Sequence, residues 1–273
     1  MSFKIIVDSC CDLTGTMLKD PCFVKVPLTI RVENSSFVDQ ADLLWAMKQS
    51  EDAPSTACPA PQSYLDAYQC GADDIYVVTL SALLSGSHNS AVQARVLLEE
   101  EEPERNVHVF NSCSASSGEA LTALKIRELA SSGMPFKKVV REVEQYICQM
   151  QTLFVLESLE NLRKNGRLTK LQAVVTGALR IKLLMGATPQ GEICKLGQAL
   201  TMKQALGKLV DRMAADPDHQ GRVAAVCHCN CLERAFALKE QIEAKCQFQQ
   251  VLILEAGGIT TVYANDGGVV VAY

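Results

Sequence analysis

Short apolar runs alternate with longer amphipathic stretches along the first half of the chain. The runs at 4–7, 74–80 and 107–110 are rich in β-branched residues, which is typical of buried strands. Stretches with helical periodicity separate and follow these runs, so the pattern predicts a parallel sheet with helices on both faces. The expected helices cover 39–50, 59–69, 85–102, 114–131 and 135–151.

After residue 151 the pattern becomes less regular. Strand-like runs occur at 152–159, 250–257, 260–265 and 268–273, and a turn at 189–191 separates two further strands. Helical stretches stand between these runs, so strands and helices no longer alternate one for one. This mixture predicts a mixed rather than a purely parallel sheet.

We therefore expect an α/β protein of two domains. Residues 1–151 would form a parallel-sheet α/β/α domain, and residues 152–273 a mixed-sheet α/β domain. An apolar helical stretch at 168–178 would follow the first strand of the second domain. Because no Pro/Gly/Ser-rich linker separates the halves, we expect them to pack closely.

Composition and charge narrow the class of protein. The 273 residues are 48% hydrophobic and 21% charged, with a net charge of -5, which fits a globular chain. The absence of a Lys/Arg-rich block argues against a nucleic-acid partner. No apolar stretch reaches the ~18 residues of a membrane span, and the N-terminal run is too short for a signal peptide. The sequence therefore predicts a cytoplasmic protein with no integral membrane segment.

The twelve cysteines are scattered and are expected to be reduced thiols. Cys227, Cys229 and Cys231 form the densest group, and on a strand all three would share one face. A zinc site usually combines two pairs of ligands with C-x₂₋₄-C spacing, and no second pair is present. We expect buried cysteines that lead from a strand into a helix, and no metal site.

Three predicted strands end in small polar residues. Asp8 with Ser9 follows the first, Ser85-Gly86-Ser87 lies just beyond the second, and Asn111-Ser112 follows the third. Ligands of open α/β sheets bind at the carboxyl ends of the strands. Ser85 stands where a helix begins, so nearby amides and the helix dipole would favour an anion, which Gly86 would let approach closely. The alternative is that Ser85 only caps the helix.

Thr56, in the segment STACPAP, is a second candidate because it precedes a proline-initiated helix. Its alternative role is local capping or loop solvation. The chain has no GxGxxG, GxxxxGK[ST] or GxSxG motif. A hydrolytic triad of Ser85, His88 and Asp8 can be drawn, but nothing in the spacing supports its geometry.

These segments together resemble the DegV family of bacterial fatty-acid-binding proteins across nearly the whole chain. IVDSCCDL (6–13) is similar to the family's N-terminal Asp-Ser segment, and TACPAP (56–61) to its Thr-Ser-x-Pro-Ser-Pro loop. LSALLSGSHNSA (80–91) resembles the family's Leu-Ser-Gly segment. NSCSASSGEAL (111–121) and LENLRKNGRL (159–168) resemble its second Asp-Ser segment and its Gly-Arg stretch. The order and spacing of these motifs are more specific than any one of them.

The resemblance implies a long-chain, palmitate-like fatty acid held between the two domains, with no other cofactor. It places the carboxylate at Thr56, Ser85 and Gly86, with Ser87 and Arg167 near the head group. We expect Tyr263, Asp8 and Ser112 as further neighbours of the head group. In some family members a separate kinase phosphorylates the carboxylate of the presented acyl chain. A fatty acid kinase catalytic subunit is therefore one expected partner, and this chain would be a carrier and not an enzyme.

The chain departs from the family pattern at several positions. Ala57 and Ala60 replace the serines of the proline loop, which removes two hydroxyls. Tyr263, in YANDG, stands where family members often carry a histidine, and it has no positive charge near neutral pH. Gln198 lies where the family tends to have a basic residue. Lipid binding is therefore predicted more firmly than transfer to a kinase.

Two other hypotheses stay open at this point. One is an enzyme that acts on a small anionic substrate at the strand ends through Asp8, Ser85 and Ser112. The other is a protein-interaction module in which a lipid is a structural filler. Neither acyl-chain length nor oligomeric state follows from the sequence.

Overall fold

The first sheet of the computed structural model is fully parallel, with strand order β2-β1-β6-β7. The structure describes residues 2–33, 35–37, 40–171 and 181–273. Every residue of β6 is buried, as its continuous apolar run predicts for a central parallel strand. The strands are β1 (Phe3–Asp8), β2 (Phe23–Val26), β6 (Asp74–Thr79) and β7 (Asn106–Asn111).

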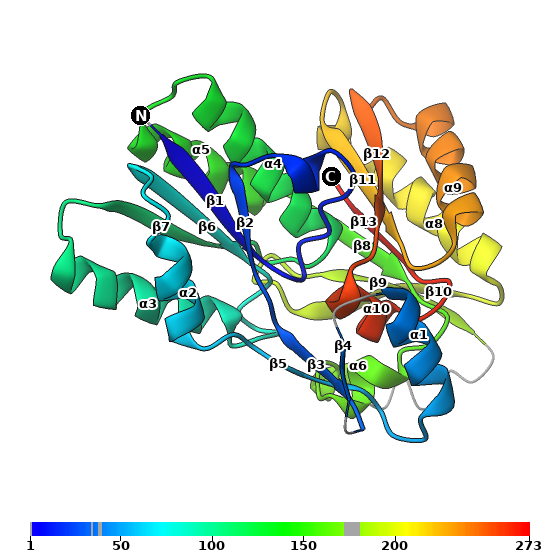
Figure 1. The fold of residues 1–273 in the computed structure, drawn as a ribbon. Helices are drawn as coiled ribbons and strands as arrows, with labels where there is room; N and C mark the ends of the chain where they lie inside the picture. The colour runs from blue at the N-terminus through cyan, green and yellow to red at the C-terminus, as the bar shows by residue number, and fades with distance from the viewer. Residues whose placement is uncertain (1, 34, 38–39, 172–180) are drawn as a thin grey trace.

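Helices cover both faces of this sheet, as Figure 1 shows. On one face α2 packs on α3, and together they contact β2, β6 and β7. On the other face α4 contacts β1 and β6, and α5 contacts β7. The predicted parallel-sheet α/β/α arrangement is thus confirmed. These helices are α2 (Pro61–Tyr68), α3 (Ser87–Glu101), α4 (Ser117–Ser131) and α5 (Phe136–Gln149).

The second sheet is mixed, with strand order β10-β9-β8-β13-β11-β12. Only β11 and β12 pair in parallel, and the other described pairs are antiparallel. Helices α8 (Met202–Ala215) and α9 (Leu232–Lys245) pack on its outer face. The strands are β8 (Thr152–Val155), β9 (Lys182–Ala187), β10 (Ile193–Ala199), β11 (Val223–His228), β12 (Gln250–Glu255) and β13 (Val269–Ala272).

Helix α4 lies between the two sheets and joins them into one packed body. It contacts β1 and β6 of the first sheet and β11 and β13 of the second. The largest buried cluster accordingly contains residues of both halves, among them Phe110, Ile126 and Met185. The mixed-sheet architecture agrees with the sequence, and the second sheet starts at Thr152. The domain boundary at 151/152 itself stays a prediction.

A third, antiparallel sheet of order β4-β3-β5 was not expected. The sequence VKVPLTIRV (24–32) predicts one extended segment. In the structure it divides between β2 of the parallel sheet and β3 of this sheet. Pro27 lies at the division, where it cannot donate a ladder hydrogen bond. The elements here are β3 (Thr29–Val32), β4 (Ser35–Phe37), β5 (Ser55–Ala57) and the adjoining helix α1 (Gln40–Gln49).

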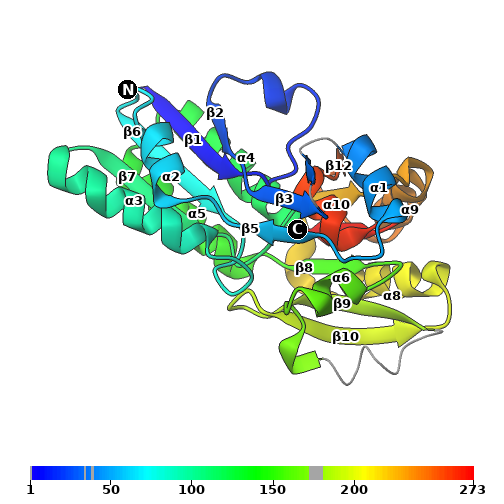
Figure 2. The ribbon, with the colours of Figure 1, turned by 60° about the horizontal axis from the view of Figure 1, so that its bottom comes forward.

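The prediction of a strand at 260–265, near the C-terminus, is wrong. Residues 258–264 form the helix α10 (Gly258–Ala264), which packs against α1 and α6 (Glu160–Lys164), as Figure 2 shows from below. The sequence TTV favours a strand, but burial against neighbouring helices overrides that weak local preference.

The predicted helix at 168–178 lies mostly outside the described residues, which record a 3₁₀ turn at Thr169–Leu171. Two other short 3₁₀ turns connect larger elements. They are Met17–Lys19 and Pro217–His219. Among the described helices, none is long and apolar enough to cross a membrane.

Candidate functional site

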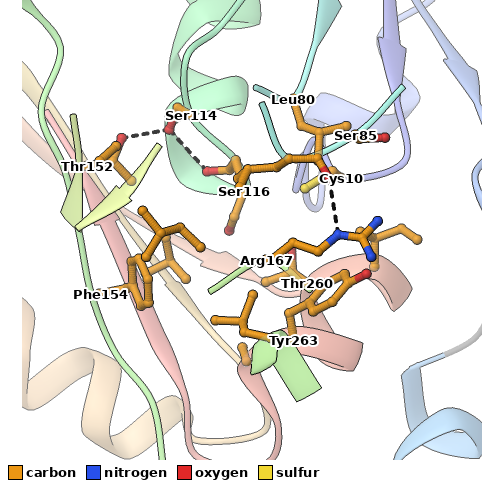
Figure 3. A pocket seen from close by; sticks show the side chains of 18 of the residues that line it. Cys10, Leu80, Ser85, Ser114, Ser116, Thr152, Phe154, Arg167, Thr260 and Tyr263 are labelled. Carbon is orange, nitrogen blue, oxygen red and sulfur yellow. Dashed lines mark hydrogen bonds between the residues drawn. The ribbon is translucent and has the colours of Figure 1, made fainter. Parts of the chain in front are cut away.

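An apolar cavity opens between the two sheets, beyond the carboxyl ends of the parallel strands. It contains about 850 Å³ of atom-free space, counting the solvent at its opening. Leu28, Leu80 and Cys10 line it from the first half, and Phe154 and Val270 line it from the second. Figure 3 shows side chains of both halves converging on this space.

Four of the residues predicted from the sequence meet along this cavity. Thr56 comes from β5, Ser85 from the loop after β6, Arg167 from the segment after α6, and Tyr263 from α10. The Thr56 Oγ1 and Tyr263 hydroxyl oxygens are 2.6 Å apart, and the Arg167 guanidinium lies 5.8 Å from the centre of the Tyr263 ring. We call these four half-buried residues the polar end of the cavity.

The position of Arg167 follows from the way α6 ends. Gly166 has a φ of +76°, a left-handed conformation that glycine adopts without steric cost. The Arg167 amide donates to the Leu162 carbonyl at 2.8 Å, and the Gly166 amide donates to the Arg163 carbonyl at 3.0 Å. This is the Schellman pattern of a helix C-terminus. The sharp turn brings Arg167 to the cavity instead of leaving it on the helix surface.

Within the cavity lining Arg167 is the one charged residue among those described. Its Nε donates to the Leu84 carbonyl at 3.2 Å and its Nη1 to the Asn165 carbonyl at 2.5 Å. No carboxylate of the described chain forms an ion pair with it. Since a guanidinium carries five N–H donors, several remain for an incoming anion.

Ser85 accepts a hydrogen bond at the start of α3, as one of its two expected roles requires. Helix α3 starts at Ser87, and the Ser85 Oγ accepts a hydrogen bond from the Ser87 amide at 3.2 Å. A hydroxyl that accepts from an amide keeps its own proton for donation. Ser85 can therefore satisfy the helix end and still donate a hydrogen bond to a ligand oxygen in the cavity.

The other hydroxyls of the lining are engaged within the protein. The Ser114 and Thr152 hydroxyl oxygens are 2.6 Å apart. Ser116 Oγ and Thr260 Oγ1 each donate to the Asp12 carboxylate at 2.6 Å. The Ser114–Thr152 and Thr260–Asp12 bonds connect the first half of the chain to the second. Among the described lining residues, the polar end contains the one cation, Arg167.

Asp12 was not singled out from the sequence, although it is an acid within an apolar run. Besides the two hydroxyls it accepts from the Gly257 amide at 2.8 Å and from the Cys227 thiol at 3.3 Å. Burial raises the pKa of the Asp12 carboxyl, and the hydrogen bonds that it accepts oppose this rise. Asp12 is thus the acceptor that links both halves behind the cavity.

Gly86, Ser87, Asp8 and Ser112 were predicted near the head group, but they are not among the described residues that line the cavity. Asp8 is fully buried and accepts from the Cys10 amide (2.9 Å), the Leu80 amide (3.0 Å) and Ser87 Oγ (2.7 Å). Asp8 and Ser87 therefore brace both ends of the loop that carries Ser85.

Glu119, on α4, was also missed. It is completely buried, and within the described structure neither of its carboxyl oxygens accepts a hydrogen bond. Burial raises the pKa of the Glu119 carboxyl well above its usual value, and charge repulsion from the neighbouring Asp8 carboxyl raises it further.

The described residues do not assemble the hydrolytic triad of Ser85, His88 and Asp8. Ser112 is fully buried, and its Oγ donates to the Ser114 carbonyl at 3.3 Å. His88 Nδ1 lies 3.2 Å from Thr79 Oγ1, and burial lowers the pKa of its imidazole. Asp8 is bound to amides and Ser87 instead of a histidine. These residues support the loop and the sheet edge.

The cysteine group leads from a strand into a helix, as predicted, because β11 ends at His228 and α9 begins at Leu232. Cys229 and Cys231 therefore lie beyond the strand, and the three thiols do not share one strand face. The three thiols donate to separate acceptors: Cys227 to Asp12, Cys229 to Thr261 and Cys231 to the Gly268 carbonyl. No cluster of three potential metal ligands occurs among the described His, Cys, Asp and Glu residues.

Fold and site together define a class: a two-domain α/β protein with an apolar cavity between its domains and one cation at the cavity's polar end. The family model described as "Uncharacterised protein, DegV family" matches residues 2–273. A DegV domain-containing protein of Streptococcus gordonii is 35% identical over 280 residues, covering 100% of this chain and 99% of the relative. The chain belongs to the DegV family.

Solved structures give the same result. A DegV family protein from Ruminococcus gnavus, refined with vaccenic acid, has a TM-score of 0.96 and 46% identity, with both chains fully covered. The fatty acid kinase B3 protein of Streptococcus pneumoniae, loaded with linoleic acid, has a TM-score of 0.91 and 34% identity, over 100% of this chain and 99% of that one. A Eubacterium eligens family protein loaded with heptadecanoic acid has a TM-score of 0.90 and 28% identity, over 99% of each chain.

Proposed function

We propose that this protein binds one long-chain fatty acid, such as palmitate, and serves as its carrier. The acyl chain occupies the apolar cavity, and the carboxylate lies at the polar end against Arg167, Ser85, Thr56 and Tyr263. The fatty acids in the similar structures from Ruminococcus gnavus, Streptococcus pneumoniae and Eubacterium eligens support this proposal.

The observation that carries the proposal is that Arg167 has no carboxylate partner and is the one charged residue of the described lining. A partly buried guanidinium without a carboxylate partner is costly, and a ligand carboxylate would supply its missing partner through charge-assisted hydrogen bonds. The ligand must then be both anionic at one end and apolar along its length. A long-chain fatty acid meets both conditions.

Energetics fit this ligand class. Burying a ~16-carbon chain at ~0.8 kcal/mol per methylene gives a gross gain on the order of 10 kcal/mol. The acyl chain thus provides most of the affinity. The polar end mainly has to satisfy the buried carboxylate and fix which end of the ligand faces it.

We also propose that chemistry on the carboxylate belongs to a separate enzyme, for example a kinase. The described lining offers no carboxylate, histidine or lysine as an acid, a base or a nucleophile for that chemistry. The similarity to a fatty acid kinase B protein supports such a partner. Tyr263 and the exposed Gln198 distinguish this chain from the usual family pattern at the positions expected to serve transfer.

The test compares palmitate with hexadecanol by isothermal titration calorimetry on delipidated protein. We expect saturable one-to-one binding of palmitate and weaker binding of the alcohol, which lacks the charge. Arg167→Gln should weaken palmitate binding by about tenfold to a hundredfold, because a hydrogen-bonded charge pair is worth about 1.5–3 kcal/mol.

Arg163→Gln is the matched control, since Arg163 lies on α6 and pairs with Glu160 at 2.6 Å. It should leave palmitate affinity within about twofold, as expected for an exposed ion pair outside the cavity. Equal affinities for palmitate and hexadecanol, or an unchanged Arg167→Gln variant, would remove Arg167 from the head-group site.

A further inference from the structure

A second, smaller cavity adjoins the one just described. It encloses about 380 Å³ of atom-free space, counting its opening. Ile147, Cys148 and Met150 from the end of α5 form one side of it, and Thr188 and Pro189 from the β9–β10 turn form the other. Cys148 and Pro189 are exposed, so this cavity reaches the molecular surface on its own side.

Three residues line both cavities: Cys113, Thr152 and Ala187. They form the wall between the two spaces, and all three have small side chains. The hydroxyls of Ser114 and Thr152, 2.6 Å apart, lie on the first cavity's side of this wall. In Figure 3, Ser114 and Thr152 stand across the cavity from Arg167 and Tyr263. The wall is therefore remote from the polar end.

The wall also includes an unusual backbone. Cys113 has a φ of +50°, which few residues other than glycine adopt. Its amide donates to Asn111 Oδ1 at 3.1 Å, which holds this turn in place. The residues that the two cavities share thus carry only small side chains.

We propose that the methyl end of a bound acyl chain passes Cys113, Thr152 and Ala187 into the second cavity. This inference rests on the proposed fatty-acid function and adds the ligand class: chains several carbons longer than palmitate. A palmitate-length chain would be held by the first cavity, and the additional methylenes of a longer chain would lie against Ile147 and Met150. Ser112, Gln151 and Thr188 also line the second cavity, so only the methylenes that contact its apolar groups add to the binding free energy. We therefore expect longer chains to bind at least as tightly as palmitate.

The experiment is a chain-length series of palmitate, stearate, arachidate and behenate on delipidated native protein and two variants. Cys148→Trp fills the second cavity from an exposed position that does not line the first. Gln145→Trp is the control, because Gln145 is exposed on the same helix and lines neither cavity. The readout is the dissociation constant of each acid.

We expect native protein to bind behenate at least as tightly as palmitate. Cys148→Trp should weaken behenate binding by about tenfold or more while palmitate binding stays within about twofold, and Gln145→Trp should change neither. Retained palmitate binding also shows that the variant is folded.

A native protein whose affinity falls stepwise beyond stearate would overturn the inference, whatever the variants do. An equal effect of Cys148→Trp on all four acids would overturn it as well. Failure of the proposed function looks different, because native protein would then bind no acid of the series, palmitate included.

Discussion

At the scale of single residues, charge is distributed unevenly around the cavity. Arg167 faces the cavity without an acidic partner. Asp8, Asp12 and Glu119 are buried outside the cavity lining, and none of them forms an ion pair with Arg167 in the described structure. Tyr263, in place of a histidine, adds a neutral donor beside Thr56. The charge of an anionic ligand would therefore be balanced by one cation, Arg167, and the hydroxyl groups would add directional hydrogen bonds.

Glu119 gives a prediction about pH. Its folded pKa is raised above the usual 4.5, so above pH 4.5 the folded protein holds a proton that the unfolded chain has released. Stability is therefore lost as pH rises from 4.5 towards the folded pKa, by about 1.4 kcal/mol per pH unit. Glu119→Gln mimics the protonated acid, so its stability relative to native protein should grow as pH rises above 4.5.

Urea unfolding at several pH values measures this difference. Glu128→Gln on the same helix is the control, since Glu128 is exposed and pairs with Lys125 at 3.1 Å. It should show no comparable change with pH. Parallel stability curves for native protein and Glu119→Gln would show that Glu119 does not retain its proton in the folded state.

The residues of the site differ in how far sequence could identify them. Thr56, Ser85, Arg167 and Tyr263 lie in recognisable segments, and the structure brings them to one cavity. Asp12 and Glu119 act through partners far away in the chain, such as Gly257 and Asp8. Their neighbourhoods depend on tertiary packing, so only the presence of an acid in an apolar segment marks them in the sequence.

At the scale of elements, α4 and the loops at its N-terminus hold the two sheets together. Ser116 precedes α4 and shares the Asp12 carboxylate with Gly257 and Thr260 at the start of α10. This contact joins the N-terminal loop, α4 and α10 at one buried point. The cavity wall beside it thus depends on a side-chain link between the halves.

Removing this link should destabilise the protein. Asp12→Ala leaves two hydroxyls and one amide without their acceptor, and we expect a loss of roughly 3 kcal/mol in the free energy of unfolding. Chemical denaturation measures the loss. Asp218→Ala, at an exposed position, should change stability by less than about 0.5 kcal/mol. An Asp12→Ala variant as stable as this control would mean that the link does not hold the halves together.

Element prediction succeeded where local and tertiary preferences agree. The run that became β6 is buried along its whole length, and the helices that follow β6 and β7 start after small polar residues. Element prediction failed where the local and the tertiary preferences disagree. Pro27 divides one extended run between two sheets, and the β-branched residues of α10 are helical because that helix packs against α1 and α6.

At the scale of the whole molecule, two sheets share one core and leave an apolar cavity between them. A ligand that binds only the folded state would stabilise the protein by mass action. We propose that this cavity holds a single fatty acid with its carboxylate at Arg167.

Mass spectrometry of the purified protein under native and denaturing conditions is the most direct test for this bound fatty acid. We expect the native mass to exceed the denatured mass by one long-chain fatty acid, either co-purified or taken up from added palmitate or oleate. Arg167→Gln should retain less of the fatty acid. A native mass equal to that of the bare chain, unchanged after palmitate or oleate is added, would show that the cavity binds no fatty acid.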